Sequence, residues 1–237
     1  MKPAATKAVK RGHFAGRERH KAAQWPSPMR DSGSGMTLWL PHHATGWRGM
    51  GSTGFHVETT PVLADARLRL LYDYWHALAV AADGLPSLQA FDPLRLPKLL
   101  PNLWILEVAG GNHRLRMRLA GENINAVYRR NIGGHYFSDV FQPSEVALMA
   151  ARYSRALTEP AIVRAVGAVY VAAGRLSQGE RLAMPMLGRS GLTDTMLGAT
   201  FYDERMVEPG AVHVMHNEPT FYPVRAGNHR PPQIAGG

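Results

Sequence analysis

Hydrophobic residues first become periodic just after residue 64, where they recur at spacings of three and four residues. The recurring positions are Leu68, Leu71, Trp75, Leu78 and Ala82. This spacing predicts a helix with one hydrophobic face over residues 65–82. Asp65 is suited to cap the start of this helix, and Gly84 is suited to end it. Three prolines within residues 91–101 then allow only short helical turns.

Strand-like patterns follow in two groups, with helical patterns between the groups. The predicted strands are residues 103–108, 114–119, 162–171, 181–187 and 193–202. Glycine-containing turns at residues 110–112, 174–179 and 188–191 separate neighbouring strands. Helices are predicted over residues 122–130 and 143–158, between the second and third strands. Because helices do not alternate with every strand, the order predicts an α+β fold with an antiparallel sheet.

Several short motifs narrow this fold further. They are Leu71-Tyr72-Asp73-Tyr74-Trp75, Asp92-Pro93, Leu96-Pro97, and the stretches at residues 99–103, 116–121 and 180–186. In order and spacing, these motifs resemble the short stand-alone PAS-domain family of alphaproteobacteria. The resemblance implies a PAS-like five-stranded antiparallel sheet with helices inserted between strands 2 and 3, plus an N-terminal helix, over residues 62–203. It also implies a module with no kinase or cyclase attached.

The two ends of the chain differ from this central part in composition. Residues 1–61 show no sustained period and carry more than half of the net charge of +9, which predicts a disordered basic extension containing Met36 and Met50 as alternative starts. Residues 204–237 are rich in Pro and Gly, which predicts a mostly irregular tail with a short helix or strand near residues 212–215. No hydrophobic run approaches the roughly 20 residues of a membrane helix, and we expect a cytoplasmic protein.

A ligand pocket is expected between the inner face of the sheet and the inserted helices. Its candidate lining residues are Trp104 (or its neighbour Ile105), Met117, Tyr128, Tyr153, Tyr170 and Met184. Aromatic and methionine walls with a few hydroxyl groups suit a small planar or acyl ligand. Two interpretations stay open, a pocket that holds such a ligand and a solid core that holds none. If buried, the hydroxyl groups of Tyr128 and Tyr153 would need partners.

Two further features suggest partners. Arg114, Arg116 and Arg118 share one face of a strand and could hold a phosphate-rich ligand or an acidic partner. The simpler interpretation is a solvated face paired with residues such as Glu107. The helical stripe of Leu68, Leu71, Trp75 and Leu78 predicts a dimer helix and a homodimer, although it also fits packing against its own sheet.

The chain lacks the motifs of the common catalytic sites. It has no GxSxG, GxxxxGK[ST] or HExxH pattern, and no cysteine, so we predict a protein without catalytic activity or a metal site. A cysteine-adduct flavin is excluded. Haem is not expected, because residues 143–158 contain no histidine.

These features together predict a sensory or protein-interaction module of bacterial signal transduction, acting through an unidentified small-molecule ligand or protein partner. The alternative is a nonspecific binder of nucleic acid or anionic surfaces that uses the basic N-terminal arm and Arg114, Arg116 and Arg118. Nucleic acid is not an expected partner, because the basic N-terminal arm lacks the interleaved aromatic residues of proteins that bind single strands.

Overall fold

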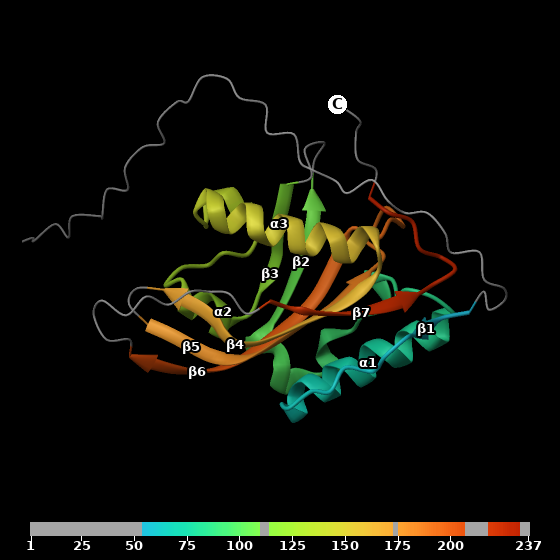
Figure 1. Ribbon diagram of the computed structural model, residues 1–237, viewed down its shortest axis with the longest axis horizontal. Helices are drawn as coiled ribbons and strands as arrows, with labels where there is room; N and C mark the ends of the chain where they lie inside the picture. The colour runs from blue at the N-terminus through green and yellow to red at the C-terminus, as the bar shows by residue number, and fades with distance from the viewer. Residues whose placement is uncertain (1–53, 110–113, 173–174, 207–217, 233–237) are drawn as a thin grey trace, which may run out of the picture. The chain divides into compact units, whose positions relative to one another are not determined.

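The computed structural model describes residues 54–109, 114–172, 175–206 and 218–232 (Figure 1). All the described residues belong to one compact unit of the chain. The elements in chain order are β1 (His56–Val57), α1 (Ala66–Ala82), the 3-10 segments η1 (Leu88–Ala90), η2 (Pro93–Arg95) and η3 (Pro97–Asn102), β2 (Leu103–Ala109), β3 (Arg114–Ala120), α2 (Glu122–Val127), η4 (Phe137–Asp139), α3 (Pro143–Thr158), β4 (Ala161–Ala172), β5 (Arg175–Met186), β6 (Thr195–Met206) and β7 (Thr220–Arg225).

The strands form one antiparallel sheet in the order β1-β7-β4-β5-β6-β2-β3. Helices α2 and α3 lie between β3 and β4 in the chain, so the predicted insertion of helices between the second and third of the five predicted strands is confirmed. The predicted number of five strands is wrong, because β7 pairs with the edge of β4 and β1 pairs with β7. In the described part of the chain the sheet therefore has seven strands.

The two additional strands come from segments that the sequence predicted to be disordered or irregular. Strand β7 pairs Ala161 of β4 with Pro223, and the next residue, Val224, is buried in the core. Both strands are short and are held mainly by backbone hydrogen bonds, which need no alternating side chains and so leave little trace in the sequence pattern. The strand or helix predicted near residues 212–215 lies outside the described residues.

Strand β5 also differs from its prediction. Residues 174–179 were expected to form a turn, but β5 begins at Arg175 and pairs with both neighbouring strands from there on. Gly179 serves a close approach of two strands, because a Cβ atom at this position would collide with the backbone carbonyl of Phe201. Gly179, which the sequence pattern assigned to a turn, is therefore a strand residue. Its lack of a side chain allows β6 to approach β5 closely.

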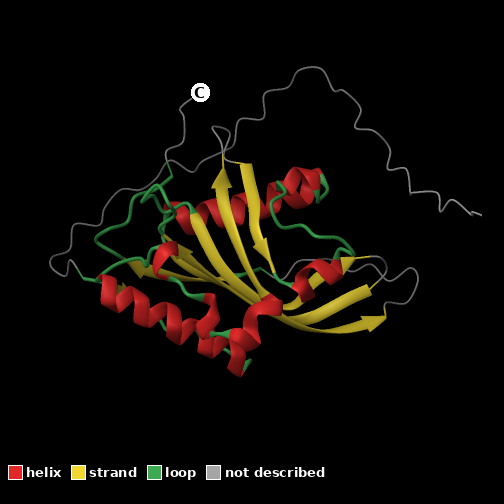
Figure 2. Ribbon diagram, turned by 180° about the vertical axis from the view of Figure 1, so that it is seen from behind, coloured by secondary structure: helices red, strands yellow, loops and turns green. Residues whose placement is uncertain are grey.

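The sheet separates two hydrophobic cores. Helix α1 packs on one face of the sheet, and α2 and α3 pack on the other, as Figures 1 and 2 show. Side chains of β5 alternate between the cores, since Leu182 and Met184 belong to the α1 core and Ala183 to the α3 core. None of the described helices is long and hydrophobic enough to cross a bilayer.

The start of α1 follows from local sequence. The carboxylate of Asp65 accepts a hydrogen bond from the backbone N–H of Arg67 at 2.7 Å, which caps the first turn as predicted. The helix ends at Asp83, which adopts a left-handed conformation just before Gly84. Its buried stripe then lies along the sheet, which fixes where the first turn meets β5.

Candidate functional site

Arg181, on the α3 face of β5, is the centre of the candidate site. Its Nε donates a hydrogen bond to Thr200 Oγ1 at 3.1 Å, and its Nη2 donates one to the Val169 carbonyl at 2.8 Å. Its guanidinium carbon lies 4.7 Å from the centre of the Tyr170 ring. Among the described residues, no carboxylate lies within 4 Å of this guanidinium. Arg181 is therefore a partly buried cation whose contacts among the described residues are all uncharged.

A bulge in β4 creates this arrangement. Ala168 pairs with Gln178 and Tyr170 pairs with Ser177, so Val169 has no partner of its own on β5. The extra residue leaves the Val169 carbonyl able to accept from Arg181, and it turns Tyr170 to the same face as Val169. Bulges of this kind redirect side chains beside functional sites.

Thr200 on β6 connects Arg181 with Trp104. The indole Nε1 of Trp104 donates to Thr200 Oγ1 at 3.1 Å, the same atom that accepts from Arg181. Trp104 lies directly opposite Gly198 of β6, where any Cβ atom would collide with the indole ring. Two donors thus converge on one hydroxyl oxygen, and Gly198 provides the space for the indole.

Four tyrosine rings surround this centre. Tyr170 makes edge contacts with Tyr128 and Tyr202, with ring centres 5.9 and 5.4 Å apart, and Tyr153 lies edge-on to Trp104 at 5.9 Å. The Tyr202 hydroxyl donates to a backbone carbonyl of α2. The hydroxyl groups of Tyr128 and Tyr153 form no hydrogen bond with another described residue, although Tyr153 is only 3% exposed. Hydroxyl groups buried in this way ordinarily have a partner.

The electrostatics of the site favour positive charge and neutral phenols. Burial lowers the pKa of Arg181, but interactions with Tyr170, Tyr153 and Tyr128 outweigh burial, so the pKa lies above its ordinary value. Burial raises the pKa of Tyr128 well above 10.0, which keeps its hydroxyl protonated. The pKa of Arg152 on α3 is lowered, first by burial and in part by Arg181. Two arginine charges thus act on each other across this region.

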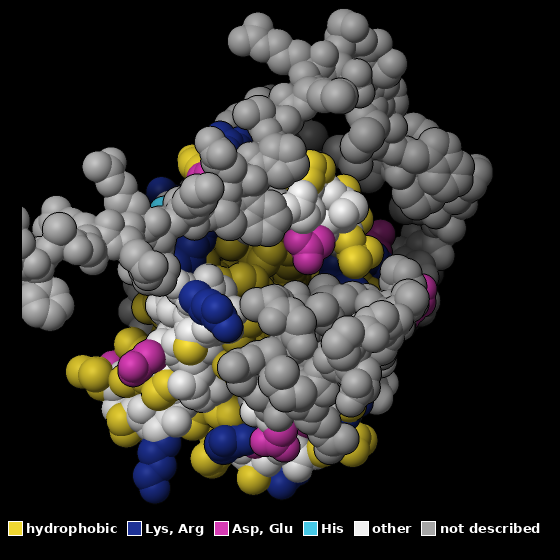
Figure 3. Space-filling view, turned by 90° about the vertical axis from the view of Figure 1, so that its left-hand side faces the viewer, with side chains coloured by type: hydrophobic (Ala, Val, Ile, Leu, Met, Phe, Trp, Pro, Cys, Tyr) yellow, Lys and Arg dark blue, Asp and Glu magenta, His cyan; other side chains and the backbone are white. Residues whose placement is uncertain are grey.

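The outer surface at the same end of the domain is hollowed. Figure 3 looks onto the end where α2 and the ends of β5 and β6 lie in Figure 1, and it shows hydrophobic side chains at the floor of a hollow with both Lys or Arg and Asp or Glu side chains beside it. A separate open groove of about 410 Å³ lies on the α1 side of the sheet, lined among others by Arg67, Glu180 and Phe201.

Most residues predicted to line the pocket do lie on the α3 face. They are Trp104, Met117, Tyr128, Tyr153 and Tyr170. Met184 is a correction, since it lies in the α1 core on the opposite face, as does Ile105. Neither Arg181 nor Thr200 was predicted from the sequence. Strand alternation places Arg181 on the same face as Ala183, and this was the signal that could have found it.

Two arginines of the predicted ladder share one carboxylate. Arg116 and Arg118 both form ion pairs with Glu107 on the neighbouring strand, the second at 3.2 Å. Arg114 donates to the Ser138 hydroxyl at 2.9 Å. These contacts agree with the simpler interpretation, a solvated face with cross-strand partners.

The predicted dimer stripe is buried within its own domain. Leu68, Leu71 and Trp75 are 0% exposed, and Leu78 packs partly against the same α1 core. These side chains cannot reach a second copy while α1 lies on the sheet, which corrects their proposed role. A dimer through α1 would have to use outward positions such as Leu70 and Val80.

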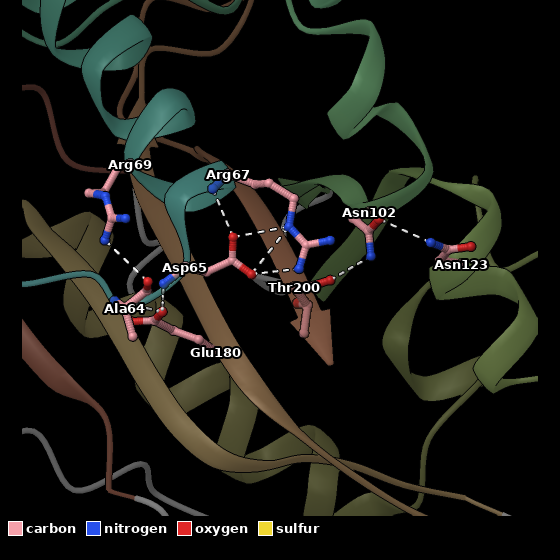
Figure 4. A network of polar contacts seen from close by, with 8 residues as sticks. All are labelled: Ala64, Asp65, Arg67, Arg69, Asn102, Asn123, Glu180 and Thr200. Carbon is pink, nitrogen blue, oxygen red and sulfur yellow. Dashed lines mark hydrogen bonds and ion pairs between the residues drawn. The ribbon is translucent and has the colours of Figure 1, made fainter. Parts of the chain in front are cut away.

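Glu180, the residue before Arg181, holds the start of α1 on the other face of β5. Its carboxylate accepts hydrogen bonds from the backbone N–H groups of Ala64 and Asp65 at 3.0 and 2.8 Å (Figure 4). It also pairs with Arg164 at 2.6 Å. The Glu180 side chain is only 6% exposed. We call these contacts of Glu180 the latch, because they join the segment before α1 to the sheet.

A second polar chain lies near the latch in Figure 4 and leads to α2. Asn102 donates to the Thr200 carbonyl at 2.9 Å, and Asn123 of α2 donates to the Asn102 side chain at 3.0 Å. Thr200 therefore contacts Arg181 through its hydroxyl group and α2 through its carbonyl. Glu180 and Arg181 on β5 and Thr200 on β6 thus connect the candidate site with the latch and with α2.

The strand order and the inserted helices define a PAS-like domain. The PAS domain family model matches residues 64–201, and the chain belongs to the PAS domain family. The chain is also 30% identical over 145 residues to a probable molybdenum cofactor guanylyltransferase of Deinococcus radiodurans, across 56% of this chain and 67% of that protein. Comparison with solved structures gives no significant match. Within the described residues, no group of three or more His, Cys, Asp or Glu could hold a metal ion.

Proposed function

We propose that this domain is a PAS-type sensory or interaction module of bacterial signal transduction, without catalytic activity of its own. A small molecule on the α3 face changes how firmly the latch holds α1, and another protein reads that change. The observation that carries this proposal is the position of Glu180 and Arg181, which are adjacent on β5 and contact opposite faces of the sheet.

The coupling is short and physical. A ligand that contacts Arg181 competes with Thr200 and Val169 for its N–H groups, so β5 and its neighbours shift to restore good hydrogen-bond geometry. Glu180 moves with the same backbone. Its hydrogen bonds to the Ala64 and Asp65 amides are sensitive to displacements of a few tenths of an ångström. A ligand that binds the two positions of β5 unequally shifts the population of the latch.

Two other functions remain as alternatives. The similarity to a probable molybdenum cofactor guanylyltransferase makes transfer of a guanylyl group to an acceptor the second candidate function. The binder of nucleic acid or anionic surfaces depends on residues 1–61, of which residues 1–53 lie outside the described part, and on arginines of which two already pair with Glu107.

Native mass spectrometry of the full chain, purified without denaturation, tests the proposal. We expect a non-covalent small-molecule adduct, or a rise in melting temperature with at least one compound of a metabolite panel, and no pyrophosphate release from GTP with Mg²⁺. The absence of both adduct and thermal shift would reject the sensory role. Steady pyrophosphate release that is lost in a single-residue variant would favour the enzyme instead.

A further inference from the structure

We infer that the ligand of the α3 face is a small organic anion, whose carboxylate or phosphate group is bound by the Arg181 guanidinium and the hydroxyl groups of Tyr128 and Tyr153. This inference rests on the proposed sensory function and assigns the class of ligand to the same site.

The charge of Arg181 is the first argument. Other arginines of the described sheet have a carboxylate partner, since Arg164 pairs with Glu180 and Arg116 pairs with Glu107. Arg181 has only uncharged contacts among the described residues, although even a partly buried charge is less costly with a counterion than without one. An anionic ligand supplies the missing counterion. The lack of a carboxylate beside Arg181 is therefore explained if this side chain binds the negative charge of a ligand that associates and dissociates.

The hydrogen-bonding capacity of the site is the second argument. Arginine can only donate hydrogen bonds. The Thr200 oxygen already accepts from Trp104 and from Arg181, so its own O–H group is left to donate. The Tyr128 and Tyr153 hydroxyl groups have no partner among the described residues. Every group left over can donate, and a carboxylate or phosphate only accepts, so the two sets are complementary.

The surrounding charges reinforce this complementarity. Arg152 on α3 lies near enough to Arg181 for that charge to lower the Arg152 pKa, although Tyr153 and Glu218 act in the opposite direction. An anion between the sheet and α3 relieves this repulsion, whereas a neutral or cationic ligand does not. The aromatic rings of Trp104, Tyr153 and Tyr170 offer apolar contacts for the rest of the molecule.

Matched pairs of charged and uncharged compounds test the inference on the full chain. The carboxylate arm compares benzoate with benzamide and octanoate with octanamide. The phosphate arm compares phenyl phosphate with phenol. We expect calorimetry to show that at least one anion binds, with an affinity about tenfold to a hundredfold higher than that of its uncharged counterpart. This ratio is the range for hydrogen bonds to a charged group. Whichever arm responds distinguishes a carboxylate ligand from a phosphate ligand.

Two variants and a control assign the effect to the site. Arg181→Met should weaken the anion by about a hundredfold or more, because it removes both the charge and the donors. The control, Arg114→Met, lies on the solvated face and should leave the affinity unchanged. If Arg181→Met does not fold, Tyr153→Phe tests the assignment instead, because it removes only one hydroxyl group. This variant should lower the affinity for the anion by about tenfold.

The failures of the two proposals are distinguishable. Equal affinities within all three pairs, or an anion affinity unchanged in Arg181→Met or Tyr153→Phe, would overturn the anionic class. Binding of a neutral compound would then still support the sensory function. If no compound binds and native mass spectrometry finds no adduct, the sensory function itself fails.

Discussion

Replacement of Glu180 by alanine should lower the free energy of unfolding by about 3 kcal/mol, the lower end of the cost of breaking a buried ion pair. The substitution leaves the Arg164 guanidinium without its partner and the Ala64 and Asp65 amides without an acceptor. Glu180→Gln retains an oxygen that can accept these bonds, so it should cost about 1–2 kcal/mol. Denaturation of the full chain in urea measures both values.

An exposed ion pair provides the control for this prediction. Glu58 pairs with Arg225 at 3.0 Å, and both side chains are well exposed. Glu58→Ala should therefore cost no more than about 0.5 kcal/mol, as is usual for surface ion pairs. Equal losses for Glu180→Ala and Glu58→Ala would mean that the latch does not hold α1 as described.

Replacement of Gly198 by alanine should destabilise the domain by about 2–3 kcal/mol, because the new methyl group occupies the place of the Trp104 indole. The ring must move, and its hydrogen bond to Thr200 is lost with it. Since Thr200 also accepts from Arg181, the same variant should weaken any ligand of the site. Thermal and urea denaturation give the first effect and calorimetry gives the second.

A smaller ring at position 104 provides the matched test. Trp104→Phe removes the part of the indole nearest to Gly198, so the added methyl group of Gly198→Ala then has room. The double variant should be at least about 1 kcal/mol more stable than the sum of the two single effects predicts. Strict additivity would contradict the contact between Trp104 and Gly198.

Elements whose causes are local could be predicted from the sequence. Helix α1 was predicted over residues 65–82 and found over Ala66–Ala82, because its cap at Asp65 and its stripe are both encoded within a few residues. The same holds for α3, which starts at Pro143 and ends at Thr158 as predicted. Periodicity reports such elements well, since it reflects the environment of each side chain in turn.

Features that depend on distant partners could not be predicted in this way. Strand β7 forms by pairing with backbone groups at the edge of β4. The hydrophobic pattern of residues 220–225 does not indicate this pairing. The bulge at Val169 places Tyr170 beside it on one face, where strict alternation would separate them. Met184 was assigned to the wrong face because its role was judged from residue type rather than from its position in β5.

Arg181 shows why the site itself was only partly predicted. The aromatic residues were found because Trp and Tyr stand out as pocket-lining types. Arg181 was passed over, since an arginine in a strand is usually on the surface. Its assignment to the candidate site depends on its hydrogen bonds to the Val169 carbonyl and to Thr200, and on the absence of a nearby carboxylate among the described residues. Only the folded structure shows these features.

Amide hydrogen exchange at Ala64 and Asp65 tests most directly whether β5 links the two faces. Both amides donate to Glu180, and the ligand would act on the adjacent Arg181. At a saturating concentration of the tightest-binding small molecule, their exchange rates should change by about threefold or more, while the rate at Val108, which donates to the Asp194 carbonyl away from the latch, stays constant. Unchanged rates at Ala64 and Asp65 with the ligand fully bound would contradict the account.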